Sequence, residues 1–235
     1  LNIFAKARTY GPNVAYGGGV ALNCVANSKI APKFDNMWIF PNPGDAGSAL
    51  GCVLAHNKER INFKDTYLGH DITRSTNPKL VVDTLLKRKV VGVANGKAEF
   101  GPRALGNRSL LGDVRYDIKD TVNTIKRRQK FRPFAPAILE EFVDEYFDGP
   151  TNEYMQFVSK AKHDYKSVTH VDGTARVQVV KKDCTSVLRP ILEEYYERTG
   201  VPMLLNTSLN IKGKPMVNTL DDAENFQTLY GVRVL

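Results

Sequence analysis

Arginines in a loop with a restricted backbone have the clearest chemical meaning in this 235-residue sequence. In residues 96–109, glycine and proline punctuate Arg103 and Arg108 directly after a short apolar run. An arginine held by a rigid backbone can bind two oxygens of one phosphate through parallel hydrogen bonds. Surface loops with solvated charges rarely contain so many conformationally restricted residues. The segment therefore predicts an anion-binding loop.

A basic run follows and includes Lys126 and Arg132. Pro133 and Pro136 restrict the backbone directly after Arg132, which favours a side chain aimed at one target. Aromatic residues within a basic run are also typical of segments that bind RNA or DNA. Cations that complement the dipole at a helix end are a third interpretation. The run by itself does not decide among the three.

Arg176 and three small polar residues are further candidates for ligand binding. Arg176 alternates with valines in a predicted strand at 175–180, and a charged side chain on a sheet needs either a ligand or a structural ion pair. Asn206, Ser208 and Asn210 follow a buried strand, at the end where ligands commonly bind in α/β sheets.

Three consecutive glycines separate a predicted strand at 13–16 from a predicted helix at 20–29. Such a turn lets a ligand approach the backbone closely and offers helix N–H groups to an anion, although a turn without a ligand explains it equally well. Asn23, on the predicted helix, could reach a ribose or a base, or simply face solvent. The candidates in this turn are Gly17, Gly18 and Gly19.

Asp45 precedes a predicted helix at 46–56, after a predicted strand at 37–40. A carboxylate in this position either caps the helix or binds a hard or borderline cation. The 3 cysteines and 4 histidines show no ligand spacing, so a metal site built from this chain alone is not expected. Few, scattered cysteines are predicted to be reduced and buried, which indicates a cytoplasmic protein.

The composition is that of an ordinary globular protein, with 42% hydrophobic and 25% charged residues. It excludes a disordered chain and a coiled coil, and no apolar run is long enough for a transmembrane helix. The net charge of +8 favours an anionic partner, which either phosphorylated metabolites or nucleic acid would satisfy.

The pattern of predicted elements is mixed α/β. Residues 1–57 show strand, turn and helix twice over, whereas 58–72 are polar and weakly patterned and predict a linker. The later elements predicted are a helix at 78–87 capped by Asn77, a strand at 90–94, a helix at 117–128, a hairpin around Asp172-Gly173, a helix at 187–199 ended by Gly200, and a strand at 203–205.

Several blocks together resemble the carboxy-terminal part of the NodU/CmcH-type carbamoyltransferases. The resemblance spans nearly the whole chain, and the longer blocks are specific because they combine rare residues in a fixed order. This sequence departs from the family at three positions: the family often has Arg where Lys97 stands, Glu where Gln129 stands and Phe where Leu209 stands. Lysine at position 97 would weaken a bidentate phosphate contact. The matching blocks are residues 17–23, 43–47, 99–109, 132–136, 170–178 and 206–208, together with Lys126.

The resemblance implies two modules. Residues 1–57 would be the C-terminal fragment of an actin/sugar-kinase-like domain, 58–72 a linker, and 73–235 a YrdC-like mixed α/β domain. The chain is thus expected to be a fragment that lacks the upstream histidine ligands of the family's metal site. Asp45 matches the remaining metal-binding aspartate.

The resemblance also implies an activity. Such enzymes form carbamoyl-adenylate from carbamoyl phosphate and ATP, and then carbamoylate an acceptor hydroxyl on a sugar, an antibiotic or a nodulation factor. The transfer would be completed by the N-terminal part of the same enzyme. The implied cofactors are ATP with Mg²⁺ and a divalent metal, expected to be iron, in the kinase-like part. Neither a membrane nor nucleic acid is an expected partner, although a YrdC-like module acting on RNA or in tRNA modification is the alternative function.

By the same resemblance, the candidate residues divide into three groups. Lys126, Arg132, Arg176 and Ser208 are expected to be catalytic. Substrate or ATP is expected to contact Arg103, Arg108, Asn206, Asn210, Asn23 and the three glycines. Asp45 is the expected metal ligand.

Overall fold

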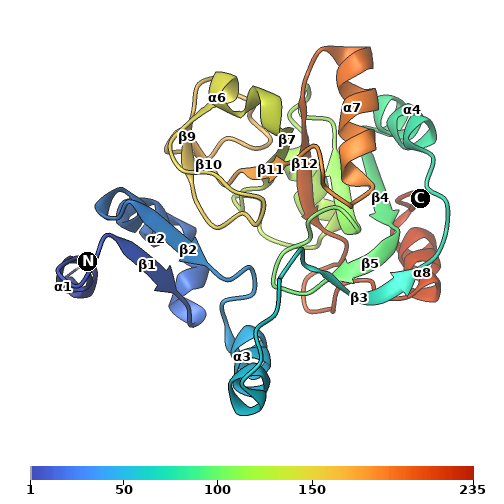
Figure 1. Ribbon diagram of the computed structural model, residues 1–235. Coiled ribbons are helices and arrows are strands. Elements are labelled where there is room, and N and C mark those ends of the chain that lie inside the picture. Colours follow the sequence, from blue (N-terminus) through green and yellow to red (C-terminus); the bar gives the residue numbers. More distant parts are fainter. Residues whose placement is uncertain (1) are drawn as a thin grey trace.

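The computed structural model describes residues 2–235 and places them in a small N-terminal body and a larger one (Figure 1). Two parallel strands form the centre of the small body, and Asn13 on the first is in register with Asn36 on the second. The strands and the long helix predicted in this region are confirmed to within one residue. The elements are α1 (Asn2–Arg8), β1 (Asn13–Tyr16), α2 (Cys24–Ile30), β2 (Asn36–Ile39) and α3 (Asp45–Asn57).

The helix predicted at 20–29 is interrupted at Asn23. A short 3₁₀ helix covers Gly19–Leu22, and α2 begins only at Cys24. The side chain of Asn23 accepts a hydrogen bond from the backbone N–H of Ala26 at 3.0 Å, which caps α2. Asparagine that bonds to the backbone in this way starts a helix instead of continuing one.

The segment predicted as a linker, 58–72, contains a strand. β3 (Tyr67–Ile72) pairs in antiparallel fashion with β5 (Gly96–Glu99) and so belongs to the larger body. Most of its side chains are exposed, so the strand carries no apolar alternation that the sequence could reveal.

A five-stranded mixed sheet forms the centre of the larger body. All neighbouring strands are antiparallel except the edge pair β11 and β7, which is parallel. In spatial order the strands are β11 (Gln178–Val180), β7 (Ala135–Leu139), β12 (Met203–Ser208), β6 (Arg108–Gly112) and β4 (Val90–Ala94). The mixed α/β class predicted from the sequence is therefore confirmed.

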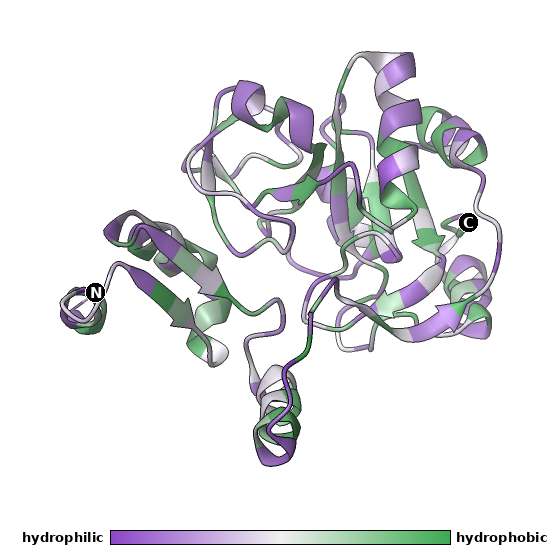
Figure 2. Cartoon of the chain, viewed as in Figure 1, coloured by the Kyte–Doolittle hydropathy of each residue, from purple (hydrophilic) through white to green (hydrophobic). Residues whose placement is uncertain are grey.

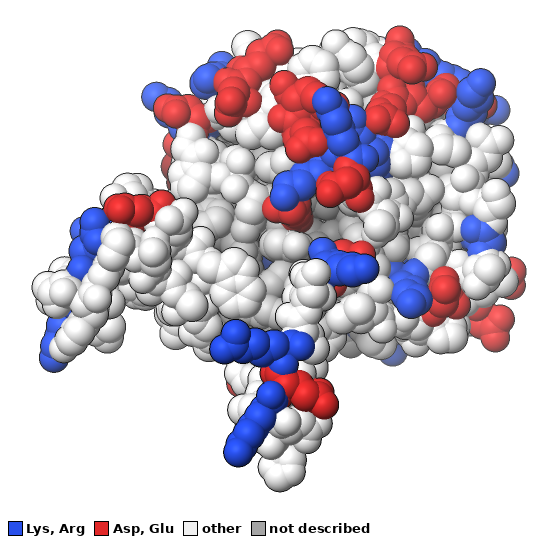
Figure 3. Space-filling model, in the orientation of Figure 1, with Lys and Arg blue, Asp and Glu red and all other residues white. Residues whose placement is uncertain are grey.

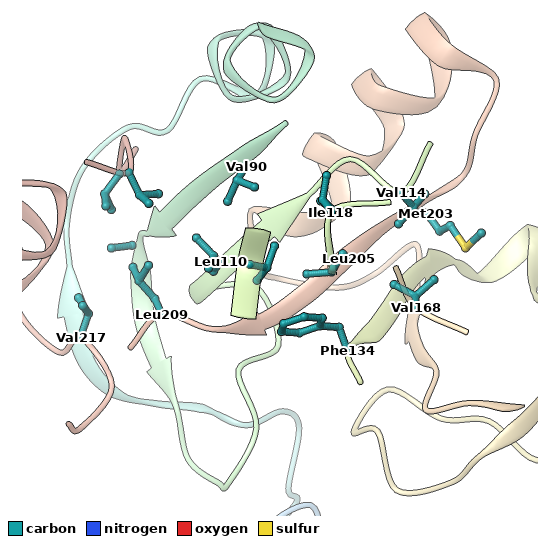
Figure 4. Packing of buried hydrophobic residues seen from close by; sticks show 14 of the residues in the cluster. Val90, Leu110, Val114, Ile118, Phe134, Val168, Met203, Leu205, Leu209 and Val217 are labelled. Atoms are coloured by element: carbon teal, nitrogen blue, oxygen red, sulfur yellow. The ribbon is translucent and has the colours of Figure 1, made fainter. Parts of the chain in front are cut away.

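Hydrophobic residues fill both faces of this sheet. Successive strand residues point to opposite faces, so Leu204 and Leu111 pack with one core cluster, and Leu205 and Leu110 with the other. Figure 4 shows the second cluster, which also includes the ring of Phe134. In Figure 2 the apolar character of β4 is plain. The first cluster lies under α4 (Pro78–Arg88) and α7 (Leu188–Thr199), and the second packs against α5 (Lys119–Ile125) and α8 (Leu220–Tyr230).

The hairpin predicted around Asp172-Gly173 is wrong, although the turn itself is present. Gly173 has a φ of 76° and donates to the carbonyl of His170, but no strand precedes the turn. Instead, β10 (Thr174–Ala175) pairs with β9 (Ser159–Ala161), which in turn pairs with β8 (Phe147–Asp148). The chain then crosses to the main sheet as β11, so that Arg176 lies between two sheets.

Buried hydrogen bonds join the two bodies. The Asn27 side chain is fully buried and donates from Nδ2 to the carbonyl of Gln156 at 2.9 Å. Ser28 Oγ donates to the carbonyl of Val158 and accepts from its N–H, both at 2.8 Å. Gln156 Nε2 donates to the carbonyl of Phe40 at 2.9 Å. These contacts hold α2 and the segment directly after β2 against the larger body.

The three cysteines are free thiols, as the sequence predicts. The expectation that they are buried is wrong: Cys52 is exposed on α3, and Cys24 and Cys184 are only partly buried. No helix within residues 2–235 combines the length and the apolar character that a membrane crossing requires.

Candidate functional site

A cavity of about 470 Å³ lies where the small body meets the larger one. Four arginines line it, and they come from three different parts of the chain: Arg103, Arg128, Arg132 and Arg176. The end of β12 contributes Asn206, Thr207 and Ser208, and the start of α2 contributes Cys24 and Val25. The structure thus brings Arg103, Arg132, Arg176 and Ser208 to one cavity, and the roles expected for them stay predictions.

The loop that carries Arg103 is fixed from beneath by Glu99. Glu99 Oε1 accepts backbone hydrogen bonds from Leu105 at 2.7 Å and from Asn107 at 2.9 Å. Gly106, with a φ of 134°, lies so close to Ser186 Oγ that an added Cβ would be 2.3 Å from it. A side chain at this position would therefore displace the loop. The Arg103 backbone is thus positioned before any ligand arrives.

The positive charge in the cavity is not balanced by the protein. Within residues 2–235, none of the four arginines forms a salt bridge. Burial lowers the pKa of Arg103, and burial together with the charge of Arg103 lowers that of Arg176. Arg176 Nε is buried without a hydrogen-bond partner. Asp172 lines the cavity too, but its exposed carboxylate accepts from Thr174. Such a site is built for an anion.

Lys126 lies beside the cavity, at the end of α5, and is buried. Its Nζ donates to the carbonyl and, at 3.3 Å, to the Oγ of Ser208, which lines the cavity. It also donates to the carbonyl and the Oδ1 of Asn210, at 2.9 and 3.0 Å. Burial, together with the charges of Arg128 and Arg132, lowers the pKa of Lys126 to about 7. Lys126 can therefore gain a proton when an anion enters.

Anion binding should weaken as the pH rises through 7, because the anion favours protonated Lys126. We expect the dissociation constant for sulfate, which does not itself titrate here, to increase from pH 7 to 9 by up to about tenfold per unit. The free protein should become more stable over the same range, because the unfolded chain keeps the proton up to the ordinary pKa of 10.5. Calorimetric titration checks the first effect.

Lys126→Met should bind sulfate more weakly and lose this pH dependence. The control is Lys130→Met, because the Lys130 side chain in the same basic run is 71% exposed. An equal pH dependence in wild-type protein and Lys126→Met would contradict the assignment to Lys126.

Arg108 is not a ligand-binding residue in this structure, contrary to the prediction. It is the first residue of β6 and is fully buried. Its guanidinium donates to backbone carbonyls at 2.8–3.1 Å, which leaves none of its terminal nitrogens facing the cavity. The acceptors are the carbonyls of His70, Asn95, Gly96, Asn107 and Asn218. Arg108 thus ties together loops that are distant in sequence.

The structure does not bring the three glycines to the arginine cavity. Gly17 and Gly18 line a separate, largely apolar cavity of about 400 Å³, together with Trp38 and Phe40. Gly19 begins the 3₁₀ helix, and the Asn23 side chain is engaged in the cap of α2. A ligand that Gly17 and Gly18 bind in that cavity would therefore be separate from one bound by the arginines.

Asp45 is the exposed first residue of α3, and its side chain does not cap the helix, whose N-cap is Gly44. In the part of the chain that the structure describes, no three His, Cys, Asp or Glu side chains are grouped to hold a metal ion. The residues present therefore do not form a metal site by themselves.

Several residues that line the cavity were not among the candidates predicted from the sequence, and they include Arg128 and His170. Arg128 lies over the ring of Phe134 at 4.3 Å, and burial and the charge of Arg132 lower its pKa to about 10. Its place in the basic run could have indicated it. His170 Nδ1 is 3.1 Å from Thr174 Oγ1. Nothing in the sequence indicated that the start of α2 would close the cavity.

Asn206, near the end of β12, and Asn210, directly after it, have different surroundings. Asn206 is buried and lines the cavity; its Nδ2 donates to the Gln178 Oε1 at 2.6 Å and to the Ala104 carbonyl at 3.1 Å. Its Oδ1 is buried without a partner. Asn210 instead contacts Lys126 and accepts from Ser208 Oγ at 2.7 Å, so it lies behind the cavity wall.

Two family descriptions match this sequence. The one named "Carbamoyltransferase C-terminus" matches residues 82–235, and "Carbamoyltransferase N-terminus" matches residues 2–54. Only residue 1 and residues 55–81, which include β3, lie outside the two matches.

Curated relatives are similar over most of the chain. Nodulation protein NolNO of Sinorhizobium fredii is 36% identical over 248 residues, which cover 89% of this chain and 36% of the relative. Nodulation protein NolO of Bradyrhizobium diazoefficiens is 35% identical, with 88% and 44% covered. The uncharacterized protein MJ1051 of Methanocaldococcus jannaschii is 36% identical, with 91% and 47% covered. The chain thus spans less than half the length of these relatives.

Among solved structures, full-length HypF in its phosphate- and nucleotide-bound form is similar to the chain. Its TM-score is 0.47 and its identity 17%, and the match covers 68% of this chain and 21% of HypF.

Proposed function

Since the chain belongs to the carbamoyltransferase family, we propose that its arginine cavity binds ATP and carbamoyl phosphate and forms carbamoyl-adenylate. The observation that carries this proposal is the group of four arginines without a salt-bridge partner in the described chain, around one cavity of about 470 Å³. Two phosphorylated substrates repel each other, and fixed cations lower the cost of bringing them together.

The side chains at the cavity suit different parts of the two substrates. The planar guanidinium groups of Arg103, Arg132 and Arg176 match phosphoryl oxygens. Lys126 adds a proton-dependent charge behind Ser208, and the unpartnered Asn206 Oδ1 offers an acceptor to a small amide. We propose that these groups orient the carbamoyl moiety next to the phosphates. Mg²⁺ would enter bound to ATP and neutralise part of its phosphate charge.

The transfer of the carbamoyl group to a hydroxyl of a sugar, an antibiotic or a nodulation factor is proposed for the longer enzyme. The chain spans less than half the length of its relatives, and Asp45 is a single carboxylate. The divalent metal and the transfer site would therefore need residues from outside residues 2–235. We also propose a cytoplasmic location, in keeping with the free thiols and with substrates that are cytoplasmic metabolites.

Release of pyrophosphate tests the proposed adenylate formation. For the reaction to balance, water releases inorganic phosphate from carbamoyl phosphate, and an oxygen of the resulting carbamate attacks the α-phosphorus of ATP and displaces pyrophosphate. The chain is incubated with Mg²⁺, ATP and carbamoyl phosphate, and we expect pyrophosphate to appear only when all three are present. Release that does not depend on carbamoyl phosphate, or no release at all, would refute adenylate formation by this chain.

Binding to RNA is the second candidate, because the chain is basic. On the face drawn in Figure 3, however, basic and acidic side chains are interspersed instead of forming one basic stripe. RNA binding would weaken steeply with salt over a broad surface. Competition by ATP for one saturable site would instead favour the proposed enzyme function.

A further inference from the structure

Gln178 connects the candidate site to the interior of the larger body. It is the first residue of β11 and only 2% exposed. Its side chain lies between the loop that carries Arg103 and the strand that carries Asn206. Gln178 Nε2 donates to the carbonyl of Leu105 at 2.9 Å, and its Oε1 accepts from Asn206 Nδ2 at 2.6 Å.

The hydrogen bonds determine which way both amides face. The Leu105 carbonyl can only accept, so Gln178 must present its NH₂ group there and its oxygen to Asn206. Asn206 must then present its own NH₂ group to Gln178. The Ala104 carbonyl, 3.1 Å from Asn206 Nδ2, requires the same orientation. The network is consistent in one arrangement only.

The consequence is that Asn206 Oδ1 has no partner within the described chain, although it is buried in a residue that lines the cavity. A buried acceptor without a donor is costly, and a ligand that supplies an N–H removes this cost. The carbamoyl group ends in an NH₂, whereas the acetyl group of nearly the same size ends in a methyl.

We propose that Gln178 is a positioning residue that holds Asn206 with its Oδ1 free for a substrate N–H, and that this pair selects carbamoyl phosphate over acyl phosphates without an amide nitrogen. The inference rests on the proposed function, because it concerns the same cavity. Gln178 itself does not contact the substrate in this arrangement. It acts by fixing the amide that does.

The test compares the binding of carbamoyl phosphate and acetyl phosphate to the full chain by calorimetry. Wild-type protein should bind carbamoyl phosphate about 10- to 100-fold more tightly, the range expected when a buried acceptor gains or lacks its donor. Gln178→Met is similar in length but cannot accept from Asn206. We expect its preference to fall to about threefold or less, because both hydrogen bonds of Gln178 are lost and the Asn206 amide keeps only its bond to the Ala104 carbonyl at 3.1 Å.

Two further variants separate positioning from a general structural role. Tyr67→Phe removes the other side-chain hydrogen bond to the Leu105 carbonyl, at 3.2 Å, without touching Asn206, and should keep the full preference. Gln178→Glu should keep it too, because a carboxyl oxygen at this position can accept from Asn206 Nδ2 whether or not the group is protonated. Thermal unfolding of each variant shows whether it folds.

Equal affinity of wild-type protein for the two phosphates would overturn the inference, and so would an unchanged preference in folded Gln178→Met. Both results come from binding alone. If wild-type protein prefers carbamoyl phosphate but releases no pyrophosphate with ATP, the selection stands and the proposed adenylate formation fails.

Discussion

Arg176→Met should abolish most of the pyrophosphate release and, at the same time, make the free protein more stable. Arg176 is the cavity arginine whose Nε is buried without a partner, and its neighbour Arg103 carries the same charge. In the proposed function, the phosphates of the two bound substrates would balance these charges. Removing one such group from the site should lower the rate by about 100-fold or more.

Arg176→Met should stabilise the free protein although it lowers the activity, because the free protein gains nothing from the charge of Arg176. A buried cation next to another cation costs free energy, and methionine fills a similar volume without charge. We expect the melting temperature of Arg176→Met to rise by about 2–4 °C, which corresponds to about 1 kcal/mol for a chain of this size. Calorimetry or circular dichroism measures this shift.

Arg127→Met is the matched control for Arg176→Met. Arg127 is exposed and lies 5.3 Å from the centre of the Tyr230 ring, away from the lining of the cavity. Its replacement should change neither the rate nor the melting temperature appreciably. If Arg176→Met kept wild-type activity, or melted at a lower temperature, the uncompensated charge would not be the basis of the site.

Arg108→Met should cause the largest loss of stability. Five backbone carbonyls lose a donor, and that of Asn107 keeps another, the N–H of Asn95 at 3.1 Å. They belong to β3, to the start of β5 and the turn before it, to the loop that carries Arg103, and to the segment before α8. Leaving buried acceptors unpaired should lower the free energy of unfolding by about 3–5 kcal/mol. Urea denaturation followed by circular dichroism measures the change.

Arg88→Met tests whether this effect comes from burial and not from arginine as such. Arg88 is exposed in the last turn of α4. Its replacement by methionine should therefore change the free energy of unfolding by less than about 0.5 kcal/mol. Equal effects of the two substitutions would contradict the structural role of Arg108. At a temperature where Arg108→Met is still folded, its affinity for ATP should equal that of wild-type protein, whereas a ligand-binding role predicts a large loss.

Elements with strong local signals were predictable from the sequence. Asn77 and Pro78 begin α4, and the Asn77 side chain accepts from the N–H of Lys79 at 3.0 Å, as an N-cap should. Gly200 ends α7 in the left-handed conformation. Such signals act over one helical turn, so no knowledge of the rest of the chain is needed. The strand at 90–94 is likewise a continuous apolar run that is buried.

Elements that depend on distant partners were mispredicted. The chain around Asp172 contains a good turn, and the sequence therefore indicated a hairpin. β10 instead pairs with β9, and β11 with β7. The middle residues of β3 are exposed, the apolar Leu68 included, so its pairing with β5 left no periodic signal. In both cases the hydrogen-bond partners lie outside any local window.

Residue types and their spacing were enough to indicate arginines suited to phosphate, a mixed α/β chain and its likeness to carbamoyltransferases, because backbone restriction and side-chain chemistry are local properties. Only the tertiary structure separated Arg103, which lines the cavity, from Arg108, which is fully buried among carbonyls. Only the tertiary structure placed Cys24 of α2 at the same cavity. It also determined the orientation of the Asn206 amide through its hydrogen bond to Gln178. Burial and partner geometry arise from contacts between distant segments, and these contacts decide what an identical side chain can do.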